Sequence, residues 1–68
     1  MTGEEFRNLR DQLGVTQQRI AELIGMSSGR AIREWESGAV AVPEPVALLV
    51  GAMAKFPRVK NWVVAKVD

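Results

Sequence analysis

Two arginines, Arg30 and Arg33, have the side-chain types and the spacing in this sequence best suited to binding chemistry. They are three positions apart, so both project from one face of a helix. An arginine donates two hydrogen bonds at once to O6 and N7 of guanine, and it can equally clamp a phosphate. A structural alternative is an ion pair on the helix surface, because Arg30 and Glu34 have i, i+4 spacing.

The elements that must position these arginines are two short helices joined by a glycine. Thr16 is a good N-cap for a helix predicted over residues 17–24, and Gly25 supplies the turn that follows. The second helix is predicted to begin near Ser27 or Ser28 and to carry both arginines. This is the arrangement with which a helix-turn-helix places side chains in the major groove of DNA. The sequence therefore favours duplex DNA as the partner, with base or adjacent phosphate contacts from the arginines.

The residues at the starts of these two helices are further candidates for contacts to DNA. Free backbone amides at a helix start attract phosphate, and short polar side chains nearby can donate to it. The candidates are Thr16, Gln17, Gln18, Ser27, Ser28 and Gly29. Each also has a structural alternative: capping for the hydroxyls, solvent exposure for the glutamines and turn formation for the glycine.

Apolar side chains at helical spacing predict further helices on both sides of this pair. A helix over residues 3–13 has a capping box at its start, formed by Thr2 and Glu5, and Gly14 ends it. Another helix starts near the prolines at 43 and 45 and stops at Phe56. Met26, just after the turn, is expected to place its side chain in the core.

The composition limits the chain to one small domain without covalent or metal cross-links. It has 68 residues, a net charge of +1, and neither cysteine nor histidine. Disulfides and Cys/His zinc sites are therefore excluded, and no thiol or imidazole is present for catalysis. We expect no enzymatic activity, no cofactor, no metal and no small-molecule ligand. No apolar stretch is long enough to span a membrane, and the acidic start is unlike a secretory signal, which together favour a cytoplasmic location.

The last segment, residues 55–68, is interpreted as a dimerisation tail that follows a core at 1–54. It fits a short helix or a short strand, and we favour the helix. An apolar surface on so small a domain suggests self-association, for which the candidates are Val59, Trp62 and Val63. The alternative function is an antitoxin-like or adaptor module that holds another protein through this tail.

Residues 3–54 resemble the Cro/cI-repressor (Xre) helix-turn-helix family. The resemblance rests on the run TQQRIAELIGMS at 16–27, on Ile32 and on WESG at 35–38. It implies an all-α, lambda-repressor-like domain of four to five short helices that binds duplex DNA. The interval from Gly25 to Trp35 is one residue longer than in most members. With this longer spacing, WESG at 35–38 and AVP at 41–43, the chain resembles a subgroup that includes anti-CRISPR-associated phage autorepressors. This resemblance implies a homodimer that represses its own promoter at an inverted repeat.

Overall fold

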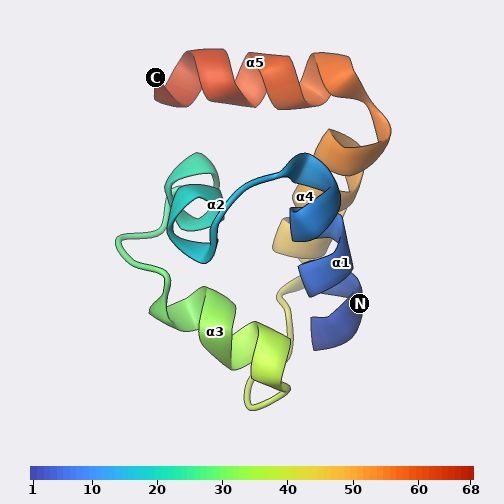
Figure 1. Ribbon diagram of the computed structural model, residues 1–68, viewed down its shortest axis with the longest axis vertical. Coiled ribbons are helices and arrows are strands. Elements are labelled where there is room, and N and C mark those ends of the chain that lie inside the picture. The colour runs from blue at the N-terminus through green and yellow to red at the C-terminus, as the bar shows by residue number, and fades with distance from the viewer.

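The structure, a computed structural model, describes all 68 residues and contains five helices and no strand (Figure 1). The helices are α1 (Gly3–Leu13), α2 (Gln17–Leu23), α3 (Arg30–Ser37), α4 (Glu44–Lys55) and α5 (Pro57–Val67). The all-α, lambda-repressor-like expectation is confirmed, and so is the helical reading of the C-terminal segment. None of the helices combines the length and apolar character that a membrane crossing requires.

The predicted signals at both ends of α1 are present in the structure. Thr2 Oγ1 accepts a hydrogen bond from the Glu5 backbone N–H at 3.0 Å, and Glu5 Oε1 accepts from the Thr2 N–H at 3.3 Å. These two bonds satisfy amides that have no partner within the helix. Gly14 ends α1 in the left-handed conformation, with φ 71°. A side chain would be strained at that angle, which is why glycine is favoured there.

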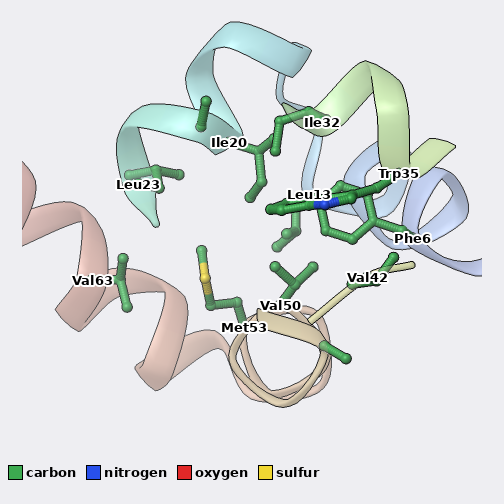
Figure 2. Packing of buried hydrophobic residues seen from close by; sticks show 12 residues of the cluster. Phe6, Leu13, Ile20, Leu23, Ile32, Trp35, Val42, Val50, Met53 and Val63 are labelled. Carbon is green, nitrogen blue, oxygen red and sulfur yellow. The ribbon is translucent and has the colours of Figure 1, made fainter. Parts of the chain in front are cut away.

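One hydrophobic core joins all five helices and the loop before α4 (Figure 2). Its buried members are Phe6, Leu13, Ile20, Ala21, Leu23, Ile32, Trp35, Val42, Ala47, Val50, Met53 and Val63. The rings of Phe6 and Trp35 meet edge to face, with centroids 5.6 Å apart. This pair fixes the buried side of α3 against α1, because both rings are almost wholly removed from water.

The expectation that Met26 fills the core is wrong. Its side chain is 37% exposed, although its backbone N–H donates to the Ala21 carbonyl at 2.8 Å. That bond, together with the left-handed Gly25 at φ 84°, closes the turn after α2 and leaves the side chain outside. The turn therefore depends on its backbone rather than on an apolar anchor.

Helix α3 begins at Arg30, two or three residues later than the sequence suggested. Gly29 occupies the cap position and belongs to the turn, and no side chain caps it. Its N–H donates to Gln18 Oε1 at 3.2 Å, and a Cβ at this position would lie 3.5 Å from the Gln18 backbone nitrogen. Gly29 is buried against the start of α2, so of its two predicted roles the structure shows turn formation.

Helix α5 packs across α4 and α2 at the end of the molecule opposite α3 (Figure 1). Val63 is only 5% exposed and belongs to the core, so the prediction that it faces a partner is wrong. Lys60 Nζ donates to the Leu13 carbonyl at 3.3 Å, and Arg19 Nη2 lies 2.6 Å from Asp68 Oδ2. These contacts fasten both halves of α5 to the rest of the domain.

Candidate DNA-binding surface

The start of α2 is fixed by the hydroxyl that the sequence indicated. Thr16 Oγ1 accepts a hydrogen bond from the Arg19 backbone N–H at 3.0 Å, and the Thr16 backbone is extended. Ile20 and Ala21, one turn further on, are fully buried. The cap fixes where α2 begins, and the buried residues fix which side of the helix faces the core. Together they determine how the first residues of α2 face α3.

Two glutamines at the start of α2 connect this helix to α3. Gln17 Nε2 donates to Glu36 Oε1 at 3.1 Å, and Gln18 Oε1 accepts from the Gly29 N–H at 3.2 Å. Neither side chain is simply solvated, which was the structural alternative in the sequence. The two glutamines therefore fix the start of α2 against α3 and the turn that precedes it.

An ion pair between Arg10 and Glu36 ties α1 to α3 beneath this surface. Arg10 Nε donates to Glu36 Oε2 at 2.8 Å, and Nη2 donates to Oε1 at 3.1 Å. The two side chains are 13% and 7% exposed. Burial alone would raise the pKa of Glu36, but hydrogen bonds from Arg10 and Gln17 outweigh it and lower that pKa. Glu36 is therefore a structural carboxylate that joins α3 to α1 and to the start of α2.

The sequence did not reveal the partners of Glu36, since Arg10 lies 26 positions away. No local spacing signals a pair so distant. The pairing of Arg19 with Asp68 was missed for the same reason. Only the i, i+4 pair of Arg30 and Glu34 was visible beforehand, and the structure contains it, with Nε to Oε1 at 3.3 Å.

Helix α3 turns its two arginines away from the core. Ile32 and Trp35 are buried on one side, while Arg30 and Arg33 are exposed on the other. The Arg30 side chain is 81% exposed. The Arg33 guanidinium makes no hydrogen bond or ion pair, and the residue is exposed. The expected common face is therefore present, and its guanidinium groups are accessible to a partner.

The serines near α3 differ in whether their hydroxyl groups already form hydrogen bonds within the protein. Ser27 is exposed and makes no side-chain hydrogen bond, whereas Ser28 Oγ accepts from the Arg30 N–H at 3.4 Å. At the other end, Ser37 Oγ donates to the Glu34 carbonyl at 3.0 Å and accepts from the Ala39 N–H. Ser37 thus closes the helix end, and Ser27 keeps its hydroxyl free.

The charges of the chain divide unevenly between its two parts. Residues 1–54 contain five basic and seven acidic residues, whereas residues 55–68 contain four basic and one acidic. The helix-turn-helix part is therefore slightly acidic as a whole. Attraction of a polyanion to α3 has to come from the local placement of Arg30 and Arg33 rather than from net charge.

The fold and this surface define a small helix-turn-helix domain. A family model described as a helix-turn-helix domain matches residues 3–56. The chain belongs to this family, and the membership supports a DNA-binding regulatory role. No curated protein and no solved structure matches the chain.

Proposed function

We propose that this protein is a transcriptional repressor that binds duplex DNA as a homodimer. The observation that carries the proposal is the face of α3, where Arg30 and Arg33 are exposed while Ile32 and Trp35 anchor the opposite side. An anchored helix with accessible guanidinium groups suits insertion into the major groove. The arginines then supply hydrogen bonds to base edges and phosphates.

Residues beside α3 complete the proposed contact surface. Ser27 and Ser28 are exposed next to Arg30, and Thr16 is exposed at the start of α2. We assign them to phosphate contacts. Gly29, which has no side chain, sets how closely the turn approaches the DNA backbone. Gln17 and Gln18 contribute to this surface mainly by fixing α2 against α3, because each already bonds within the protein.

Self-association is proposed through the outer face of α5. Trp62 is 63% exposed on this helix, and Val59 beside it is half-buried. A large exposed aromatic side chain on a small domain suits a protein contact. A two-fold dimer would bind an inverted repeat, with half-sites about one turn of DNA, roughly 34 Å, apart.

The regulatory circuit follows from the resemblance to anti-CRISPR-associated phage autorepressors. We propose that the dimer occupies the promoter of its own operon in the cytoplasm and blocks transcription there. Operator occupancy would then rise with protein concentration, which provides negative feedback.

Footprinting on the DNA upstream of the protein's own gene tests the proposal, with the stoichiometry measured on the same complex. We expect a protected inverted repeat, two protein chains per site, and binding that weakens as salt rises. Arg33→Ala should reduce the affinity. The proposal is refuted if the upstream DNA shows no salt-sensitive binding, or if Arg33→Ala binds as tightly as the parent.

A second candidate function is an antitoxin-like or adaptor role, which the exposure of Trp62 also favours. In that case α5 would hold a different protein. A toxin gene adjacent to this gene would support this candidate, whereas an adjacent anti-CRISPR or other phage gene would support the autorepressor.

A further inference from the structure

We propose that the two arginines of α3 have different roles on DNA: Arg30, oriented by Glu34, reads a guanine, and Arg33 binds the phosphate backbone. The inference rests on the proposed function, because it concerns the same face of α3. It goes further by naming the base that is recognised, the arginine that contacts it and the carboxylate that orients this arginine.

The place of Arg30 on α3 suits contact with a base edge. It is the first residue of the helix, and recognition helices contact bases with their N-terminal residues. At about 100° per residue, Arg33 lies roughly 60° to one side of Arg30 and Glu34 roughly 40° to the other. Arg30 is therefore near the middle of the exposed face, which points to the floor of a groove, while its two neighbours point toward the walls.

The bond between Arg30 and Glu34 orients the guanidinium without consuming its binding end. It uses Nε, which donates to Glu34 Oε1 at 3.3 Å, so Nη1 and Nη2 stay free. The side chain remains 81% exposed. Two free nitrogens at the tip of a held guanidinium match the O6 and N7 acceptors of guanine. Holding the side chain in advance also lowers the entropy lost when it binds.

The charges on the two edges of α3 favour a phosphate role for Arg33. Its guanidinium has no partner in the protein, whereas the carboxylate of Glu34 is on the other edge. Phosphates attract the first edge and repel the second. We infer that α3 sits in the groove with its Arg33 edge toward one sugar–phosphate wall and its Glu34 edge away from the other.

Glu34 is thus a positioning residue, and its loss has two effects of opposite sign. Removing its charge strengthens binding to any duplex, since one repulsion disappears. Removing its acceptor oxygen frees Arg30 and weakens the preference for guanine. Glu34→Ala removes both the charge and the acceptor, whereas Glu34→Gln removes the charge but keeps an acceptor. If Glu34 only stabilised the helix, its substitution would not raise the affinity for any duplex while lowering the preference for guanine.

The experiment starts from a random-sequence duplex library, from which the parent protein selects its bound sequence. Each guanine in that sequence is then replaced by 7-deazaguanine, which lacks the N7 acceptor. For the parent, replacement at one position per half-site should weaken binding about 5- to 150-fold, the range for losing one base contact. Arg30→Ala should bind the two duplexes almost equally, because alanine has no donor that could reach N7 of guanine.

The matched variants separate the two arginines. Arg33→Lys should keep the sensitivity to 7-deazaguanine, and Arg33→Ala should weaken binding to all duplexes alike and reduce the salt slope by about one. Both Glu34 variants should bind unselected duplexes more tightly than the parent, with Glu34→Gln retaining more guanine preference than Glu34→Ala. Circular dichroism on each variant checks that the helices are intact.

Two results would overturn the assignment while leaving the proposed function in place. One is sensitivity to 7-deazaguanine that disappears with Arg33→Lys but survives Arg30→Ala. The other is a selected sequence in which no guanine replacement matters. A library that yields no enriched duplex and no salt-sensitive binding would instead overturn the proposed function itself.

Discussion

Arg10 of α1 and Glu36 of α3 are joined by two hydrogen bonds, one of 2.8 Å from Nε and one of 3.1 Å from Nη2. Arg10 Nη1 also donates to the Val15 carbonyl at 3.0 Å, in the segment that leads into α2. One guanidinium therefore connects three successive elements. Because α3 carries the proposed DNA contacts, this pair fixes the position of those contacts relative to α1.

Arg10→Met should destabilise the fold by about 3 kcal/mol, because removing one partner leaves the Glu36 carboxylate mostly buried without its cation. Urea unfolding followed by circular dichroism measures the change. The double variant Arg10→Met, Glu36→Leu should recover part of the loss, since no unpaired charge remains. Glu22→Gln, which removes an exposed partner of Arg19, is the control and should change nothing measurable. A cost for Arg10→Met as small as the control's would contradict this account.

Stability should fall in acid because the pKa of Glu36 lies below its ordinary value of 4.5 in the folded state. Burial acts to raise that pKa, but the combined lowering by hydrogen bonds from Arg10 and Gln17 is larger. The unfolded chain then binds the proton at a higher pH than the folded chain does. The contribution is present above about pH 4.5 and is lost as the pH falls through the lower, folded-state pKa. Thermal midpoints between pH 7 and pH 3 measure this loss.

Glu36→Gln provides the comparison for that acid transition. It should be less stable than the parent at pH 7, and its midpoint should decline less between pH 5 and pH 3. Asp68, whose pKa is lowered by its hydrogen bond from Arg19, adds a decline of the same sign in both proteins. Parallel declines in the parent and the variant would show that Glu36 is not responsible.

Gly3→Ala should be destabilising, because a Cβ there would lie only 2.1 Å from the Trp35 carbonyl oxygen. Backbone atoms of α1 and α3 would have to separate, at a cost of about 1–3 kcal/mol. Gly51→Ala in α4 is a control of opposite sign, since nothing lies within 4 Å of a Cβ there. It should stabilise the protein by about 0.5–1 kcal/mol, which is the helix penalty of glycine. Equal effects of the two substitutions in urea unfolding would refute this reading.

Adjacent residues of α5 should separate folding from association. Val63→Ala should cost about 2 kcal/mol, because it removes two buried carbon atoms and leaves a cavity. Trp62→Ala should change stability by less than about 0.5 kcal/mol at low protein concentration, since the indole is mostly exposed. In sedimentation experiments, however, Trp62→Ala should shift the protein toward monomer. Unchanged association would remove Trp62 from the dimer surface.

Local signals predicted much of the fold. These signals are the capping box at Thr2, the N-cap at Thr16 and the left-handed glycines at 14 and 25, and each involves only residues close to it in the sequence. Spacing alone also placed Arg30 and Arg33 on one face. Each of these features depends on helix geometry, which is the same in every protein.

Apart from the exposed Met26, the errors and omissions depend on tertiary packing. Gly29 lies in the turn because it packs against the start of α2, and Val63 is buried because α5 crosses α4 and α2. Met26 points outward, although an apolar residue after a turn commonly points inward. The partners of Glu36 come from two other helices. Such contacts join residues that are far apart in sequence, so no periodicity reveals them.

The two tryptophans of this chain differ sharply in their surroundings. Trp35 is 4% exposed and packed edge-on against Phe6, whereas Trp62 is 63% exposed on α5. Indole fluorescence depends on contact with water, so the molecule carries two intrinsic optical reporters. Emission from Trp35 follows opening of the core, and soluble quenchers reach Trp62 first. In a Trp62→Phe protein, the remaining signal reports on folding alone, without any attached dye.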